Sequence, residues 1–280
     1  MFWDYITFPF FVLGSTITAW AVLRCGVPNL LVTPLVVGPF IALAFVLERV
    51  RPERVQPAER DFSILLEAAH FIFNFELGYG LSLLASAGLE RGVHAVLPNL
   101  WPTNLPMPLQ LLWAVTLYEA TSYWQHRLFH RRPRLWAFHA LHHSGGYLDF
   151  IRGGRFHFVD FATVGFAAYF PLVVLGTPED VITLLAVLVA TLGLVHHGNF
   201  RCRTPAWLDW LICTPAVHRW HHSWHVEESN ANFGNTVMIF DLLFGTYERP
   251  HPVGPDRIGI PEDPLPKGFW AQFFGPFGAR

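Results

Sequence analysis

The chain has 280 residues, of which 52% are hydrophobic and 14% are charged. Typical soluble domains carry roughly 25% charged residues, so this composition argues against a soluble domain and indicates a surface that faces lipid. The formal net charge of -2 excludes a protein that binds nucleic acid through overall positive charge. The three cysteines, Cys25, Cys202 and Cys213, form no C-x-x-C pair, which favours a reduced, intracellular setting.

Six apolar segments predict helices that cross a membrane. Four of them are long spans of about 20 residues, and they cover residues 5–23, 30–47, 62–87 and 107–126. Two more, 159–176 and 179–196, are separated by a Gly-Thr-Pro turn that breaks the helix. We expect these two to form a helical hairpin that either spans or re-enters the membrane. The predicted fold is all-α, a polytopic transmembrane helix bundle of four long spans plus this hairpin.

The basic residues predict the orientation of this bundle, because positive residues accumulate in the cytoplasmic loops of membrane proteins. If the N-terminus is cytoplasmic and all six segments cross, 17 of the 19 basic residues lie inside, and Arg24 and Arg91 lie outside. We therefore expect a cytoplasmic helical cap. Eighteen of the 19 are arginine, which is typical of a GC-rich bacterial genome and indicates the bacterial inner membrane.

Twelve of the fifteen histidines lie between residues 126 and 225, and most fall in the predicted cap. His126 and His130 end the fourth span, where residues four apart share one helix face. Two H-x2-HH clusters follow, at His139, His142 and His143 and at His218, His221 and His222. Adjacent residues on a helix diverge by about 100°, so each doublet can reach two metals. The pattern therefore predicts a dinuclear centre that the cap carries.

Imidazole is a ligand for iron, copper, zinc and nickel. The chain has neither the Glu-x-x-His pairs of soluble di-iron bundles nor the H-E-x-x-H of zinc hydrolases. Separate structural roles for each histidine do not explain a spacing that occurs twice. A metal-binding membrane protein or metal-ion transporter is the alternative from another class. Transport, however, needs ionisable residues along a path through the bilayer, and these histidines crowd one edge.

Several motifs occur in a fixed order along residues 110–248. They are H-R-L-F-H at 126–130, H-A-L-H-H-S at 139–144, R-F-H at 155–157, H-G-N at 197–199, H-R-W-H-H-S at 218–223 and N-F-G at 232–234. In these motifs the chain resembles the fatty acid hydroxylase / sterol desaturase superfamily of integral-membrane di-iron oxygenases. We divide it accordingly into N-terminal transmembrane helices and linker (1–105), a fatty acid hydroxylase-like catalytic domain (106–248) and a C-terminal cytoplasmic tail (249–280).

The resemblance implies that nine histidines ligate two iron ions and so form the catalytic centre. These are His126, His130, His139, His142, His143, His197, His218, His221 and His222. His157 is a tenth candidate ligand, although Phe158 stands where the family has proline, and a hydrogen bond to a ligand is its other possible role. His196 is a weaker candidate beside His197.

Metal-bound histidines usually donate their second ring N–H to an acceptor nearby. Candidate residues for this layer are Glu119, Ser122, Asp160, Asn199, Asn232 and Asp241. A polar stripe on the third span, formed by Glu67, His70 and Asn74, lines a substrate tunnel or forms a hydrogen-bond network between helices.

The resemblance further implies a monooxygenase that hydroxylates a C–H bond of a lipid, fatty acyl, sterol or related, with O2 and external electrons. A desaturase on the same scaffold is the alternative. The sequence contains no dinucleotide-binding G-x-G-x-x-G motif at a strand-to-helix junction. The expected partners are therefore a lipid substrate, the bilayer, and an external electron donor such as a ferredoxin or a cytochrome b5-like reductase system.

Overall fold

The structure is a computed structural model and describes residues 2–54, 64–94, 98–250, 254–262 and 265–278. Within these ranges the regular elements are all helices, and strand pairing is limited to three isolated bridges. The all-α prediction is confirmed.

The bundle consists of long helices, close to where the apolar segments predict them. They are α1 (Phe2–Arg24), α2 (Asn29–Val50), α3 (Ile64–Ala69) continued through a π-helical turn η1 (His70–Asn74) into α4 (Phe75–His94), α5 (Met107–Arg131), α7 (Phe158–Leu175) and α8 (Glu179–His197). Five helical stretches are long and apolar enough to cross a membrane: α1, α2, Leu65–Val93, α7 and α8. The chain is therefore an integral membrane protein.

Helix α5, which we expected to be the fourth span, has 25 residues but is not among these five. It carries the polar residues Gln110, Glu119 and Ser122, and all three are buried against the rest of the protein. Leu112 and Trp113 of the same helix are exposed. This helix is less apolar than the others because it supplies the polar inner wall of the bundle.

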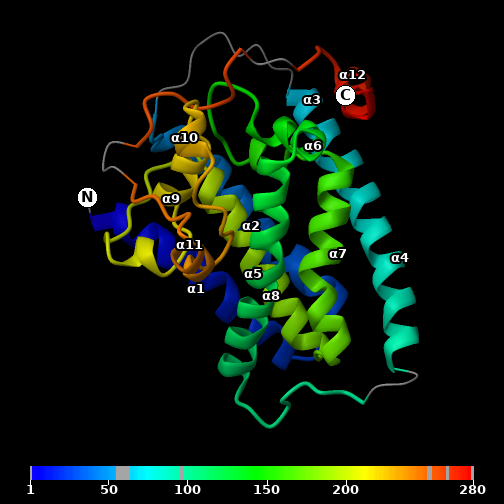
Figure 1. The fold of residues 1–280 in the computed structure, drawn as a ribbon. Helices are drawn as coiled ribbons and strands as arrows, with labels where there is room; N and C mark the ends of the chain where they lie inside the picture. The colour runs from blue at the N-terminus through cyan, green and yellow to red at the C-terminus, as the bar shows by residue number, and fades with distance from the viewer. Residues whose placement is uncertain (1, 55–63, 95–97, 251–253, 263–264, 279–280) are drawn as a thin grey trace.

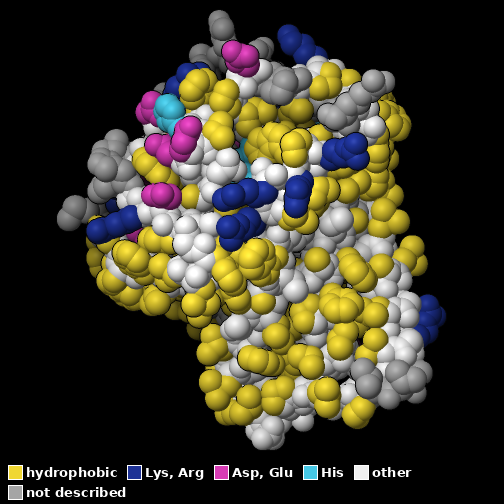
Figure 2. Space-filling view, viewed as in Figure 1, with side chains coloured by type: hydrophobic (Ala, Val, Ile, Leu, Met, Phe, Trp, Pro, Cys, Tyr) yellow, Lys and Arg dark blue, Asp and Glu magenta, His cyan; other side chains and the backbone are white. Residues whose placement is uncertain are grey.

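The bundle is assembled around α8, which packs against α1, α2 and α5, whereas α7 packs between α4 and α5. In α8, 61% of the apolar window is buried, against 17–22% in the other four candidate spans. Gly78 permits the close approach of α4 to α7, because a Cβ there would lie 2.7 Å from the carbonyl oxygen of Phe158. The outer helices leave broad apolar surfaces, and Figure 2 shows hydrophobic side chains covering the lower part of the visible face.

Three helix connections lie at one end of the bundle. The Asn29 amide donates to Asp180 Oδ1 (3.0 Å), and the Leu100 N–H donates to the Leu175 carbonyl (3.0 Å). The short helices that carry or contact most of the histidines lie at the opposite end (Figure 1). The long helices therefore run between these two ends of the bundle.

The short helices form a cap over that second end. They are α6 (Pro133–His143), η2 (Arg152–Gly154), η3 (Leu208–Trp210), α9 (Pro215–His221), α10 (Val226–Ser229), α11 (Ile239–Phe244) and α12 (Phe269–Gly278). Each is too short to bury a core alone, so the cap depends on its contacts with the ends of α5, α7 and α8. Helix α12 belongs to the segment that we expected to be a tail, and it packs against α6.

Candidate metal centre

The structure gathers nine histidines into two adjacent groups. The first group consists of His126, His130, His139, His143 and His221, and the second of His142, His197, His218 and His222. Within each group, the ring nitrogens that can bind a metal all lie within 4.8 Å of one another. These nine are the residues that the family resemblance implies as ligands.

The first group is built from three helices. The C-terminal end of α5 supplies His126 and His130, α6 supplies His139 and His143, and α9 supplies His221. The Nε2 atom of His126 lies 3.1 Å from that of His139 and 3.0 Å from that of His221. The Nε2 of His130 is buried and makes no hydrogen bond with any residue that the structure describes. The α-helical spacing of four residues places both histidines of each helix on the same face, as predicted.

The second group is built from the ends of three helices. His142 comes from α6, His197 ends α8, His218 lies in α9, and His222 directly follows α9. The Nε2 of His197 lies 2.9 Å from that of His218, 3.2 Å from that of His142 and 3.3 Å from that of His222. Gly153 allows this packing, because a Cβ there would lie 2.8 Å from the ring of His197.

In each of these imidazole rings, the hydrogen bond of the Nδ1 atom, which points away from the group, determines whether the Nε2 atom carries a proton. The Nδ1 of His126, His197 and His221 donates to the backbone carbonyls of Phe233 (2.8 Å), Gly193 (2.8 Å) and Ala231 (2.7 Å). A carbonyl only accepts, so each of these nitrogens carries the ring proton. The Nε2 atoms of these three histidines are therefore unprotonated and present lone pairs to the neighbouring rings.

Lone pairs about 3 Å apart repel each other unless a cation lies between them. Imidazole nitrogens bind zinc at about 2.0–2.1 Å, which places two of them about 2.8–3.4 Å apart around one ion. The Nε2 pairs named above are separated by 2.9–3.3 Å. Both the separations and the tautomers therefore fit a metal ion in each group.

The protonation behaviour agrees with this assignment. Burial, strengthened by the neighbouring histidines, holds the pKa of His142, His143, His218 and His222 well below its usual value. Burial lowers the pKa of His221 to about 3. These imidazoles are neutral at physiological pH, which is the form that binds metals.

The two groups share a border. His142 and His143 are neighbours in α6 but belong to different groups, and the ring of His143 stacks on that of His222 with centroids 4.3 Å apart. The H-x2-HH doublets thus diverge into two positions, as the sequence analysis predicts. The site has room for two metal ions side by side.

Asp160 orients the first group directly. Its Oδ2 accepts from Nδ1 of His139 at 2.6 Å, and both side chains are buried. This carboxylate–histidine pair fixes the tautomer of His139 and points its Nε2 at the metal position. Asp160 was expected to accept a hydrogen bond from a ligand, and it does accept one from the candidate ligand His139.

Glu119 and Asp241 act one step further away. Glu119 accepts from the backbone N–H groups of Asn235 (3.0 Å) and Thr236 (2.6 Å), and Asp241 accepts from those of Phe233 (2.9 Å) and Gly234 (2.8 Å). Both acids therefore hold the loop of residues 233–237 in place. The Phe233 carbonyl of this loop accepts the hydrogen bond from His126 Nδ1. Among the described residues, neither acid has a hydrogen bond to a histidine, which corrects the expectation that Glu119 hydrogen-bonds a ligand.

Two other candidates for this layer, Asn232 and Asn199, have structural partners. The Asn232 side chain bonds the backbone of Glu248, and Asn199 pairs with the backbone of Arg54. The Ser122 Oγ is buried and has no hydrogen-bond partner among the described residues.

The structure places His157 outside both groups. Its Nδ1 accepts from the Val159 N–H (3.2 Å), and its Nε2 donates to the Phe273 carbonyl (2.8 Å). Both ring nitrogens are thus occupied, and neither is free to bind a metal. His196 donates from Nε2 to the Cys213 carbonyl (2.6 Å) and lies outside the two groups of histidines.

The polar stripe on the third span forms a network between helices. Glu67 pairs with Arg152 (3.6 Å) and Arg155 (3.5 Å), while His70 accepts from Asn74 and donates to Gln272 of α12. This favours the second of the two roles expected for the stripe.

Sequence reasoning missed the stacking of an aromatic ring on a candidate ligand. The ring of Phe156 stacks on His142 with centroids 3.8 Å apart and planes 15° apart. It also missed the carbonyl acceptors at Gly193, Ala231 and Phe233, because a backbone carbonyl leaves no trace in the residue pattern.

Together, the helical bundle and the paired histidine groups define an integral membrane protein that can hold two metal ions at one end of its helices. The model of the fatty acid hydroxylase family matches residues 111–246. An ornithine lipid hydroxylase, OlsE, from Rhizobium tropici is 34% identical over 246 residues, which are 86% of this chain and 74% of that protein. The chain belongs to the fatty acid hydroxylase family.

Other relatives match shorter stretches. An alkylglycerol monooxygenase from Xenopus tropicalis is 26% identical over 146 residues, 51% of this chain and 32% of that protein. A Delta(7)-sterol 5(6)-desaturase, ERG3A, from Gibberella zeae is 26% identical over 154 residues, 55% of this chain and 40% of that protein. No solved structure matches the chain significantly.

Proposed function

We propose that this chain is a membrane-bound di-iron monooxygenase that hydroxylates a C–H bond of a lipid. In this reaction one atom of O2 enters the C–H bond, and the other leaves as water after two electrons and two protons are added. The observation that carries the proposal is the convergence of unprotonated Nε2 atoms on two adjacent points in a buried site. Two iron ions held there would supply the activation of O2 that this chemistry requires.

The protein's own residues have three tasks in this reaction. The nine histidines of the two groups would hold the ions, and no carboxylate belongs to either group. Asp160 and the carbonyls of Phe233 and Ala231 keep the imidazoles of the first group in the binding tautomer. Burial of the histidines keeps water away from the reacting atoms.

The substrate we propose is an acyl lipid of the membrane. The R. tropici relative, which matches 86% of this chain, is named as an ornithine lipid hydroxylase, and the alkylglycerol monooxygenases are also named for a lipid. The apolar outer surface of the bundle supports a substrate that comes from the bilayer. Desaturation is the second candidate, since one relative is named as a sterol desaturase.

We further propose that the histidine end faces the cytoplasm of a bacterial cell, at the inner membrane. The distribution of basic residues supports this orientation, with 17 of 19 at the histidine end in a six-crossing topology. An acidic ferredoxin or a cytochrome b5-like reductase system would deliver the two electrons there.

The test uses the full-length protein in lipid vesicles, loaded with ferrous iron and supplied with a reductase system and a bacterial lipid extract. We expect an O2-dependent lipid product that has gained one oxygen atom, detected by mass spectrometry. His142→Ala should abolish the product. His225→Ala is the matched control, because His225 lies outside both groups and pairs with Asp256.

A product that has lost two hydrogens would establish the desaturase instead. Absence of any O2-dependent product, together with metal flux across the vesicle membrane, would establish a metal-ion transporter.

A further inference from the structure

The C-terminal helix α12 has two unlike faces. It lies outside residues 111–246, which match the family model, and outside both histidine groups. Gln272 and Phe273 are buried, whereas Trp270 (59%), Phe274 (60%) and Phe277 (57%) are exposed. Exposing three large aromatic side chains to water is unfavourable, because removing apolar surface from water lowers the free energy.

The buried face fixes α12 to the rest of the protein. Gln272 Oε1 accepts from His70 Nε2 (2.7 Å) and from Arg155 (3.1 Å), and the Phe273 carbonyl accepts from His157 (2.8 Å). His157 follows Phe156, whose ring stacks on His142 of the second group. The position of α12 is therefore set by the network that borders the metal site.

The exposed face continues the lipid-facing surface of a candidate membrane span. Phe73 of η1 has its ring 5.5 Å from Phe269 and 5.9 Å from Trp270 of α12. Phe71, Ile72 and Phe73 are all exposed, and they lie at the histidine end of the candidate span Leu65–Val93. The aromatic face of α12 thus lies beside the histidine end of this candidate span.

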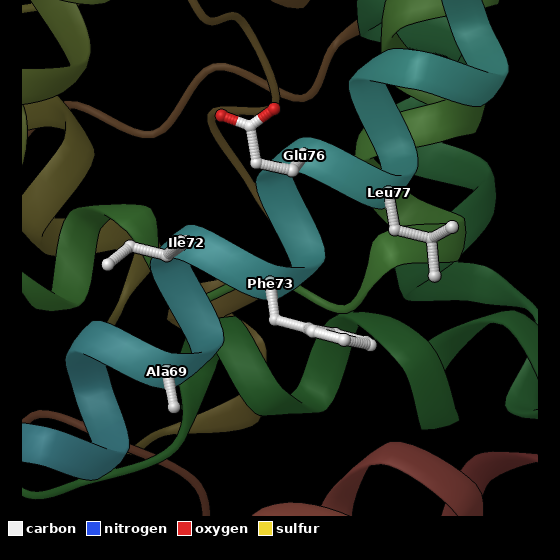
Figure 3. A pocket seen from close by; sticks show the side chains of 5 residues that line it. All are labelled: Ala69, Ile72, Phe73, Glu76 and Leu77. Carbon is white, nitrogen blue, oxygen red and sulfur yellow. The ribbon is translucent and has the colours of Figure 1, made fainter.

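A hollow lies beside this surface. It has a volume of about 440 Å³ and is open to the outside, and it is lined by Ala69, Ile72, Phe73, Glu76 and Leu77 (Figure 3). Four of its five lining residues are apolar, so the hollow suits an acyl chain better than a polar ligand. Phe73 belongs both to the hollow and to the contact with α12.

We propose that α12 is an interfacial helix whose aromatic face, formed by Trp270, Phe274 and Phe277, inserts among the lipids of the bilayer beside this hollow. Lipid is the occupant that the surface favours, because the aromatic face is continuous with a transmembrane surface. Aromatic residues are enriched at the membrane interface, where amphipathic helices bury one face. Lys267, exposed just before α12, can reach lipid phosphates from there.

The test measures where the aromatic face lies in the membrane-bound protein. In a Cys25→Ser background, where Cys202 and Cys213 are buried, Phe274→Cys carries a nitrobenzoxadiazole label. Glu227→Cys, exposed on α10 of the cap, is the matched control. The proteins are placed in phosphatidylcholine vesicles with or without doxyl groups on the acyl chains. We expect doxyl lipid to quench the label at position 274 at least twofold more than at 227, and aqueous iodide to do the reverse.

Iodide quenching at 274 equal to that at 227 would overturn the proposal, since the face would then lie in water. Shielding of 274 from both quenchers would also overturn it and would indicate a protein partner or a second copy. Trp270→Cys, on the same face, must give the same result as Phe274→Cys. Neither labelled position belongs to the histidine groups, so hydroxylation activity tests the proposed function separately.

Discussion

The two histidine groups have different surroundings, although they are similar in composition. In the first group, Asp160 binds the outer nitrogen of His139, and the carbonyls of Phe233 and Ala231 bind those of His126 and His221. In the second group, the carbonyl of Gly193 binds His197. The Nδ1 atoms of His142 and His222 are buried and find no hydrogen-bond partner in the described part of the chain.

This difference separates a preorganised metal position from a more adaptable one. Hydrogen bonds to the outer nitrogen orient an imidazole and raise its basicity, and a carboxylate does both most strongly. We therefore expect the first group to hold its metal more tightly and the second group to lose its metal first under chelation. Four substitutions test this contrast.

The largest effect is expected from His139→Ala, which removes a ligand of the first group and leaves buried Asp160 without its partner. Activity should fall roughly 100-fold or more, beyond the 10–100-fold typical of losses in the layer around the ligands. About half of the bound iron should be lost as well, as measured by elemental analysis. His142→Ala should also remove about half, but from the second group. Full iron content in either variant would show that the two groups do not bind separate ions.

A smaller loss is expected from Asp160→Asn, which keeps the size of the side chain but removes its charge. The first group then resembles the second, and metal affinity or activity should fall about 10–100-fold. The measurement is competition with a chelator of known affinity. Asp180→Asn, at the far end of the bundle where Asp180 accepts from Asn29, is the control and should leave affinity unchanged. Equal affinity in both variants would contradict the role of Asp160.

The second group alone should respond to Phe156→Leu, which removes the ring that stacks on His142. Aromatic stacking contributes about 0.5–1.5 kcal/mol, so affinity of the second metal should fall about twofold to tenfold. Stepwise metal titration followed by absorbance separates the two binding events. Phe170→Leu, on the exposed face of α7, is the control. If binding of the first metal weakened instead, Phe156 would support the first group and the prediction would be wrong.

The smallest effect concerns pH and the loop that carries the Phe233 carbonyl. Burial raises the pKa of Asp241 to about 6. The folded protein then binds a proton between about pH 6 and pH 4 that the unfolded chain does not bind, so this contribution to stability is lost as pH rises through 6. From pH 5 to pH 7, the wild type should lose about 1 kcal/mol relative to Asp241→Asn. Thermal unfolding of both metal-free proteins at the two pH values measures this difference, and parallel pH profiles would contradict it.

The fold and most of the site followed from residue spacing. Apolar runs of about 20 residues predict the membrane helices because bilayer thickness fixes that length. Helical periodicity predicts that His126 and His130 share a face, and that His142 and His143 diverge. The polar inner face of α5 shows the limit of this reasoning, since a helix that is buried on one side needs less apolar sequence than one surrounded by lipid.

The assignments that needed correction depended on contacts between distant parts of the chain. His157 carries the residue type and the motif of a ligand, yet its proton goes to the carbonyl of Phe273, 116 residues later. Glu119 binds a loop that lies another 116 residues along. Local spacing in the sequence does not indicate either partner. The partner of His157 lies in α12, a helix in the segment that we expected to be a tail.

The convergence of nine histidines from α5, α6, α8 and the α9 region has a mechanical consequence. When bound, the two ions would join the ends of these helices as cross-links do, across separations of 55 residues between His142 and His197 and 95 between His126 and His221. Removing them would leave the cap attached to the bundle by its other contacts alone. Chelation should then make the cap's connecting segments more susceptible to protease while the membrane helices remain protected. The metals would thus determine the shape of the cap as well as its reactivity.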